Sequence, residues 1–326
     1  MHRIKSLLTE NVAMVGLIAV LIIGMLVSSA FMTQQNMTNV LRTSSIMGIV
    51  AAGMTFVIIC GSIDLSVSSV FSLGGFFFIA FSGMSPVLAF IVPLIAGMAV
   101  GVLNGFLITK LKIPAFVGTL ATLLLVRGLV LLLSNEASIR GDLSPALVFL
   151  GRGMILPTLL SFPLVLFIII VIAASYMLKK RPIGRAMYCV GGNAEAARMM
   201  GVSVDKTLFT AHALSGILAG LAGAVSASRL GSAVPLAGTG YELFAIAAVV
   251  IGGAPLTGGI GKMTGTLFGS LIMGSFSNIF SMQRLLDPMW ERIVVGVILL
   301  IIVLLQSAVS IYGSANRKFS SVSQRE

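Results

Sequence analysis

Few side chains in this sequence have the types and spacing that catalysis requires. His2 and His212 lack the spacing of a zinc-binding helix, and no serine lies in the glycine-flanked turn of a hydrolase nucleophile. Residues 258–262, Gly-Gly-Ile-Gly-Lys, look like part of a phosphate-binding loop, but Met263 follows where that loop needs Ser or Thr. The sequence therefore predicts no catalytic residue, no metal site and no cofactor bound by this chain.

Four polar residues in or beside apolar segments are candidates for function, because such groups are costly in a membrane. We interpret Arg127 as a structural residue that pairs with a nearby acid, although it could instead face the bundle interior. Asp64 falls at a predicted helix break and suits a cap for the next helix, with a gate as the alternative. Glu242 could accept hydrogen bonds at a pathway mouth or satisfy backbone donors at a helix start. His212 is interpreted as a packed polar residue rather than a proton relay.

Composition places these residues in a membrane protein. The chain is 57% hydrophobic and only 10% charged, with a mean hydropathy of +1.09, which is too apolar for a water-soluble globule of 326 residues. The net charge of +11 comes from basic residues beside apolar segments, so it indicates membrane orientation rather than nucleic-acid binding. Cys60 and Cys189 are interpreted as free thiols. We expect an all-α, polytopic transmembrane bundle.

About ten apolar segments approach the roughly twenty residues that a helix needs to cross the hydrocarbon. The predicted spans are 12–32, 43–60, 65–82, 86–109, 114–133, 158–178, 207–227, 241–253, 263–282 and 290–312. The first lacks a convincing cleavage site and is expected to be retained. The eighth is about half the required length and leads into the glycine-rich residues 252–261, so we interpret it as a half-helix before a broken, buried turn.

The distribution of basic residues predicts the orientation of these spans. With the amino end inside, fourteen of the 21 Lys and Arg residues fall inside, six fall outside, and Arg127 lies within a span. The positive-inside rule then places both termini in the cytoplasm.

A basic interruption at 179–206 is the main polar segment of the chain. Six basic residues fall within it: Lys179, Lys180, Arg181, Arg185, Arg198 and Lys206. Asn193 can cap a short helix, Glu195 lies in its first turn, where an acid is favoured, and Gly201 can end it. We interpret this segment as a cytoplasmic surface knob that contacts another protein.

Small residues recur at helical spacing in three of the spans. They are Gly97, Gly101 and Gly105, then Gly216 and Gly220, then Gly265 and Gly269. We expect close helix packing within one chain, with a dimer seam as the alternative. Residues 52–61 and 245–253 also resemble each other, since each runs an apolar helix into a glycine-containing break. Paired broken helices would indicate a transport pathway.

Several segments together resemble the permease subunits of ribose-type ATP-binding-cassette sugar importers, and the resemblance covers nearly the whole chain. The segments are 53–58 (GMTFVI), 61–67 (GSIDLSV), 112–117 (KIPAFV), 184–185 (GR), 190–193 (VGGN), 196–198 (AAR), 237–242 (AGTGYE), 247–253 (AAVVIGG) and 257–261 (TGGIG). The sequence departs from the family pattern where Ser62 and Ser68 replace two glycines, which puts any hinge role of those glycines in doubt.

The resemblance implies a non-catalytic transport subunit, folded as one domain over 1–326, in a bacterial inner membrane. Its partners would be a second permease chain, the same or related, two cytoplasmic ATPase subunits that bind ATP and magnesium, and a periplasmic binding protein that delivers a pentose or similar sugar. The alternatives are a stand-alone facilitative or ion-coupled transporter and an intramembrane enzyme.

The resemblance also assigns candidate site residues. It implies that the knob is the coupling helix received by the ATPase, with Gly191, Gly192, Asn193, Glu195, Ala196, Arg198 and Gly201 as its residues. The candidate translocation pathway or gate comprises Phe56, Asp64, Ser66, Thr239, Tyr241 and Glu242. A neutral sugar should be bound by aromatic, hydroxyl and amide groups rather than by charges.

Overall fold

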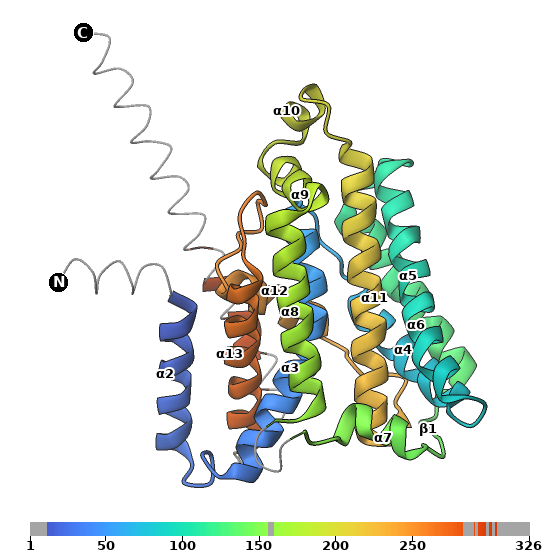
Figure 1. Cartoon of the computed structure of the whole chain (residues 1–326), viewed down its shortest axis with the longest axis vertical. Coiled ribbons are helices and arrows are strands. Elements are labelled where there is room, and N and C mark those ends of the chain that lie inside the picture. The colour runs from blue at the N-terminus through green and yellow to red at the C-terminus, as the bar shows by residue number, and fades with distance from the viewer. Residues whose placement is uncertain are drawn as a thin grey trace, which may run out of the picture.

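The chain folds as a bundle of helices that run side by side (Figure 1). The computed structural model describes residues 12–155, 160–282, 290, 293–297, 300, 301 and 304. Within them, strand is limited to two residue pairs, so the prediction of an all-α bundle is confirmed. The last predicted span, 290–312, lies largely outside the described residues.

Within the described residues, nine helices match nine predicted spans in place, and three shorter helices were not predicted as spans. The elements are α2 (Val12–Val27), α3 (Gln34–Ile59), α4 (Val67–Ser82), α5 (Pro86–Thr109), α6 (Ala115–Ser134), β1 (Ile139–Arg140), α7 (Pro145–Arg152), α8 (Phe162–Lys180), α9 (Pro182–Gly192), α10 (Ala194–Met199), α11 (Val204–Leu230), β2 (Ser232–Ala233), α12 (Tyr241–Ile251) and α13 (Met263–Met282). The strands pair antiparallel.

Hydropathy predicted the positions of the helices more accurately than the residues at which they begin and end. Helix α3 begins at Gln34 rather than at residue 43, because its polar first turns continue the helix without adding hydropathy. Helix α2 ends at Val27 rather than at residue 32. The half-length eighth span is confirmed as the 11-residue α12.

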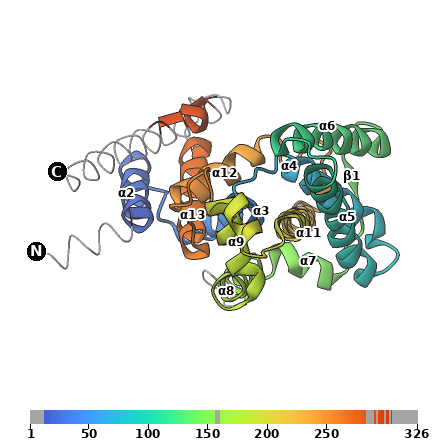
Figure 2. The same ribbon diagram turned by 90° about the horizontal axis from the view of Figure 1, so that it is seen from above.

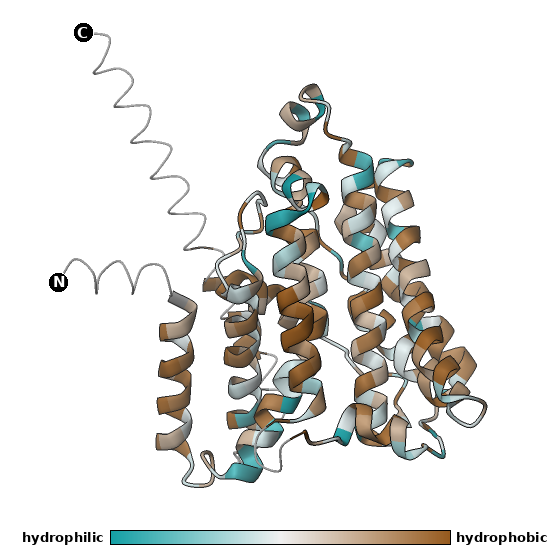
Figure 3. Cartoon of the chain, in the orientation of Figure 1, coloured by the Kyte–Doolittle hydropathy of each residue, from teal (hydrophilic) through white to brown (hydrophobic). Residues whose placement is uncertain are grey.

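Five described helices, α3, α5, α6, α8 and α11, are long and apolar enough to cross a membrane. Three shorter apolar helices, α2, α4 and α12, add to them. Figure 3 shows hydrophobic residues along the middle of the bundle and hydrophilic residues gathered toward its two ends. This distribution suits a protein that spans the hydrocarbon and exposes its ends to water.

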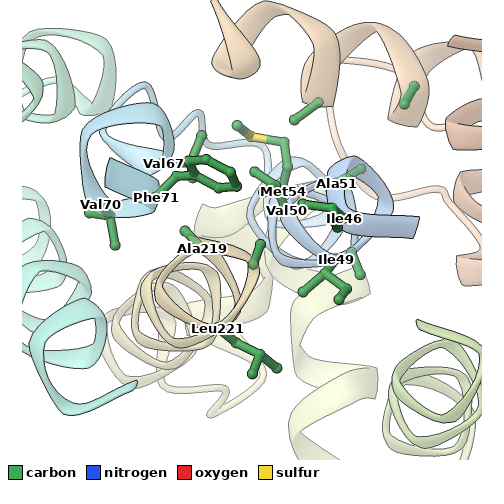
Figure 4. Close-up of a cluster of buried hydrophobic side chains, with 14 of the residues drawn as sticks. Ile46, Ile49, Val50, Ala51, Met54, Val67, Val70, Phe71, Ala219 and Leu221 are labelled. Atoms are coloured by element: carbon green, nitrogen blue, oxygen red, sulfur yellow. The ribbon is translucent and has the colours of Figure 1, made fainter. Parts of the chain in front are cut away.

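The core of the bundle lies around α3, α4 and α11 (Figure 4). Met54 and Val50 of α3 approach Val67 and Phe71 of α4, and all four side chains are at most 2% exposed. Most of the second half of α3 is buried. Helix α3 is therefore surrounded by protein, although its hydropathy would equally allow contact with lipid.

The two helix breaks predicted from the internal resemblance lie against each other. The first separates α3 from α4, and the second separates α12 from α13. The N–H of Gly259 in the second break donates to the carbonyl of Ile59 beside the first, at 2.9 Å. One turn away, the hydroxyls of Thr55 and Thr266 lie 2.7 Å apart. The helix–break–helix pattern thus occurs twice, and the two copies share an interface.

The predicted glycine faces pack helices within this chain. A Cβ atom added to Gly97 or Gly101 of α5 would collide with the backbone of α11 at Gly216 or His212, and one added to Gly216 would collide with Gly97. Gly265 of α13 has the same relation to Gly252. The prediction of close packing inside one chain is confirmed, because missing side chains are what let these backbones touch.

We expect Gly216→Val to destabilise the bundle by about 1–3 kcal/mol or to prevent its folding, because the new side chain would overlap backbone atoms of α5. Gly128→Val on α6 is the matched control, since nothing lies within 4 Å of a Cβ at that position. Thermal unfolding in detergent measures both variants. Equal midpoints for the two would contradict this account of the α5–α11 contact.

The two ends of the bundle differ in structure (Figure 1), and Figure 2 views the bundle from above. Helices α9 and α10 lie at one end, which we call the knob end, and α7 and the β1–β2 pair lie at the other. Arg42, Arg140, Arg152 and Arg229, which were all predicted on the outer side, lie with α7 and the strands. These four arginines therefore share one end of the bundle, which we call the arginine end; the predicted orientation of the spans stays a prediction.

Candidate functional site

A buried polar cluster lies at the break between α3 and α4, with Asp64 at its centre. One carboxyl oxygen of Asp64 accepts from the N–H and the hydroxyl of Ser66, at 3.0 and 2.6 Å. The other accepts from the hydroxyl of Ser215 on α11, at 2.8 Å. Asp64 and Ser215 are each 0% exposed. A buried carboxyl group that accepts several hydrogen bonds holds its donors in one arrangement.

Two further helices, α5 and α6, contribute side chains to this cluster. The amide nitrogen of Asn104 on α5 donates to Ser66 at 2.8 Å and lies 3.4 Å from Asp64. The amide oxygen of Asn104 accepts from the hydroxyl of Thr122 on α6, at 2.7 Å. One hydrogen-bonded network thus connects the broken segment to α5, α6 and α11.

His212 lies one turn before Ser215 on α11 and is also 0% exposed. Its Nε2 lies 3.0 Å from the hydroxyl of Ser62, and its Nδ1 lies 3.9 Å from Asp64 without a hydrogen-bond partner among the described residues. The interpretation of His212 as a packed polar residue agrees with this position. Ser62, which replaces a family glycine, supplies its partner.

The prediction that Asp64 is the N-cap residue of the following helix is wrong. The N-cap position of α4 is Ser66, and Asp64 lies two residues earlier, where its carboxyl group binds the Ser66 N–H in a local turn. The sequence also placed Phe56 and Ser66 in a pathway. Both are buried, at 2% and 1% exposed, so they lie inside this chain rather than along an open channel. Their part in translocation remains a prediction.

The other predicted pathway residues lie at the start of α12. The Tyr241 ring packs edge-on against Phe71 of α4, with ring centroids 5.0 Å apart. Glu242 has one carboxyl oxygen that is buried without a hydrogen-bond partner among the described residues. The exposed Thr239 donates to the carbonyl of Leu236 at 2.7 Å. Asp64 and Ser66 lie directly before α4, and Tyr241 packs against it. Helix α4 therefore connects the predicted pathway residues of the α3–α4 break with those at the start of α12.

Arg127 is a structural clamp, as interpreted: the carboxylate of Glu242 is near enough to interact with its charge, while its hydrogen bonds go to neutral acceptors. Its guanidinium donates to the hydroxyl of Ser72 at 2.7 Å and to the carbonyls of Pro235 and Ala237 at 2.8 and 3.1 Å. These contacts tie α6 to α4 and to the segment that leads into α12. Neutral acceptors were missed because the sequence was searched for opposite charges.

The knob at α9–α10 is built largely as predicted. The side chain of Asn193 accepts from the N–H groups of Glu195 and Ala196, at 3.0 and 2.9 Å, and so caps α10. Gly201, with φ of +80°, lies in the left-handed region two residues after the helix ends. Ala197 packs with Val190 and Val204 in a small separate core. The knob is therefore held in shape before any partner binds.

Part of the predicted coupling segment belongs to other elements. Lys179 and Lys180 form the last turn of α8, and Gly191 and Gly192 end α9 rather than a loop. A Cβ atom on Gly191 would overlap the carbonyl of Ile59, so Gly191 is a packing residue against the α3 end. Two large apolar side chains of the knob are strongly exposed: Met199, the last residue of α10, at 87%, and Met200, directly after it, at 69%.

The arginine end carries a group of guanidiniums from three helices. Arg152 donates to the carbonyl of Arg229 at 2.7 Å, and Arg229 donates to Thr43 on α3 at 2.8 Å. Arg42 lies 3.4 Å from the carbonyl of Arg152, and its Nε is buried without a hydrogen-bond partner among the described residues. The hydrogen-bond acceptors of these three guanidiniums are neutral, so the group carries net positive charge.

Sequence reasoning missed Asn104, Thr122 and Ser215. They could have been found as polar side chains, one amide and two hydroxyls, inside otherwise apolar spans. Asn104 also lies directly before one of the glycines that were predicted to pack closely. No group of three or more His, Cys, Asp and Glu side chains that could hold a metal occurs within the described residues. The hydrogen bonds of the cluster hold the α3–α4 break against α5, α6 and α11.

Comparison with known proteins gives consistent matches over most of the chain. It is 37% identical over 310 residues to the ribose import permease protein of Escherichia coli (strain K12), covering 93% of this chain and 95% of that protein. It is 40% identical over 293 residues to the ribose import permease protein of Bacillus subtilis (strain 168), covering 89% and 90%. It is 33% identical over 344 residues to the xylose transport system permease protein of Escherichia coli (strain K12), covering 86% of each.

No solved structure gives a significant match. The relatives are named as permeases, and the described helices are apolar enough to span a membrane several times, so the chain is a multi-pass membrane protein. A family model matches residues 36–303, which include the buried cluster, the knob and both helix breaks. The chain therefore belongs to the permease family described as the branched-chain amino acid transport system / permease component.

Proposed function

We propose that this chain is the membrane-spanning subunit of an ATP-driven importer of a monosaccharide, in a bacterial inner membrane. The observation that carries the proposal is the preformed knob, a capped helix whose surface is exposed at one end of a permease bundle. The sugar class is supported by relatives named for ribose and xylose. A ribose-like pentose is the substrate that we infer.

The energy for transport comes from partner chains in this proposal. The sequence lacks a complete phosphate-binding loop, so ATP and magnesium bind to cytoplasmic ATPase subunits that receive α10. This chain is not an enzyme. A second permease chain completes the translocation path, and both termini lie in the cytoplasm, on the same side as the knob.

The structure suggests how motion of the knob reaches the helix breaks. Helix α11 begins at Val204, three residues after Gly201, and runs without interruption to Leu230. Ser215 lies eleven residues along it, or about 16 Å at 1.5 Å per residue, where it binds Asp64. Displacing α10 would therefore move a rigid helix that is bonded directly to the α3–α4 break. Such a link can shift the bundle between alternating-access states.

The arginine end is the docking surface for the sugar-binding protein in this proposal. Arg42, Arg152 and Arg229 present positive charge on the side opposite the knob. A binding protein with carboxylates on its docking face would be steered to it, with an association rate that falls as salt rises.

Affinity capture of the tagged chain from its native membranes in mild detergent tests the assembly. We expect an ATPase subunit to be recovered with it, and the presence or absence of a distinct permease then decides between a heterodimer and a homodimer. Recovery of the chain alone, together with solute uptake by vesicles that contain nothing else, would favour a stand-alone facilitative or ion-coupled transporter.

We expect the double variant Glu195→Ala/Arg198→Ala to lose ATP-driven uptake while remaining in the membrane. Both side chains are exposed on α10, so the substitutions change the surface that meets the ATPase without disturbing the core. Uptake is measured in whole cells and normalised to the amount of chain in the membrane. Wild-type uptake by a variant present at wild-type amount would remove α10 from its assigned role.

A further inference from the structure

A cavity of about 710 Å³ lies beside the glycine-rich break at the knob end of the bundle. It is lined by Lys179 at the end of α8, Tyr188 of α9, Lys262 and Thr264 at the start of α13, and Met14 of α2, among others. Its volume is within the range of about 300–1,000 Å³ that small-molecule sites occupy. Neither the buried cluster nor the exposed surface of α10 uses it.

The charge of this cavity is positive. Lys179 and Lys262 come from different elements and are both exposed, and no carboxylate is among the described residues that line the cavity. The described residues provide neither lysine with an ion-pair partner, whereas Lys110 and Lys112 at the same end are paired with Asp205. Two unneutralised ammonium groups on one cavity favour an anion.

The wall between the lysines is held by hydrogen bonds within the protein, and the start of α13 adds backbone donors. Gly259 is fixed to Ile59 through its N–H, and the Tyr188 hydroxyl donates to the carbonyl of Gly261 at 2.8 Å. Burial raises the pKa of Tyr188, so its hydroxyl stays protonated and adds no negative charge. The first N–H groups of α13 follow Lys262, and helix geometry leaves them without partners inside the helix. The two lysines and the first residues of α13 thus line one cavity.

Apolar side chains make up much of the remaining lining of the cavity. Met14 on α2 is 40% exposed, Ile260 is 65% exposed, and Phe268 of α13 also lines the cavity. A free phosphate ion gains nothing from such surfaces. A molecule with a phosphate next to an acyl chain can satisfy both parts of the cavity.

We propose that this cavity binds the headgroup phosphate of an anionic phospholipid, with Lys179 and Lys262 as its charged contacts. The acyl chains lie against α2 and α13. The proposal rests on the cavity and its lining and is independent of the transported substrate. In this proposal the bound lipid holds α2 against the rest of the bundle.

The test uses the full-length chain, purified in detergent with equal amounts of phosphatidylglycerol and phosphatidylcholine that carry the same acyl chains. Native mass spectrometry measures which lipid each variant retains. We expect the wild type to retain phosphatidylglycerol preferentially and Lys179→Gln/Lys262→Gln to lose roughly 30-fold in that preference. The control Lys180→Gln/Lys206→Gln removes the same charge from exposed positions outside the cavity and should behave as wild type.

The outcomes separate the possible ligands. If both double variants lose the preference for phosphatidylglycerol equally, the site is overturned, because the preference would then depend only on the net charge of the protein. Retention of the two lipids in equal amounts by the wild type would also overturn it. Complete displacement of phosphatidylglycerol by inorganic phosphate would show that the cavity takes a free anion, which contradicts the lipid assignment. A thermal midpoint equal to that of wild type verifies that each variant is folded.

Discussion

Asp64→Leu is expected to destabilise the bundle by about 3–5 kcal/mol and to abolish transport. The substitution leaves the Ser66 N–H and the hydroxyls of Ser66 and Ser215 without their acceptor, in a region where none of the groups is more than 1% exposed. Each buried donor that loses its partner costs about 1–3 kcal/mol. Thermal unfolding in detergent and uptake in cells measure the two effects.

Two comparisons make the Asp64 result specific. Asp64→Asn retains an acceptor for Ser66 and a polar group for Ser215, so we expect a smaller loss of stability than in the leucine variant. Asp142→Leu removes an exposed carboxylate from a loop at the arginine end and should change stability by no more than about 0.5 kcal/mol. If Asp64→Leu unfolds at the same temperature as Asp142→Leu, the buried network does not hold the α3–α4 break.

Met199→Asp/Met200→Asp is expected to prevent association with the ATPase and therefore to stop ATP-driven uptake. The two side chains are 87% and 69% exposed at the tip of the knob, and exposed apolar groups of this size are typical anchors of an interface. Loss of a central anchor costs about 2 kcal/mol or more, which is roughly a 30-fold weaker complex. Co-purification of the ATPase measures the change.

A matched control for this variant lies at the opposite end of the bundle. Met84 is 71% exposed in the turn after α4, so Met84→Asp introduces a charge at an equally exposed methionine without touching the knob. It should retain the ATPase. Wild-type recovery of the ATPase by Met199→Asp/Met200→Asp would mean that α10 is not the contact.

Hydropathy and spacing predicted much of the fold. Helix α5 begins and ends at the predicted residues, since Pro86 and the polar Lys110 lie directly at its boundaries. The glycines of α5 and α11 predicted close contacts, but spacing alone could not show that these two helices are each other's partners. Helices α7 and α9 were not predicted, because each is too short to give a span signal.

The candidate site was predicted only in part, for a physical reason. Asp64 was placed at a helix break because local sequence determines where a helix ends. Its partners Asn104 and Ser215 are 40 and 151 residues away in the chain, so only the packed bundle brings them together. The Asn193 cap was predicted correctly because its hydrogen bonds reach only two and three residues along the chain.

The central claim is that transport through this chain depends on ATP hydrolysis by a partner. The most direct measurement is uptake of labelled ribose into proteoliposomes that contain the chain, with and without the captured ATPase, internal ATP and the binding protein. We predict uptake only when all components are present, and no ATP hydrolysis by the purified chain. Uptake by the chain alone, unchanged by ATP, would contradict the account.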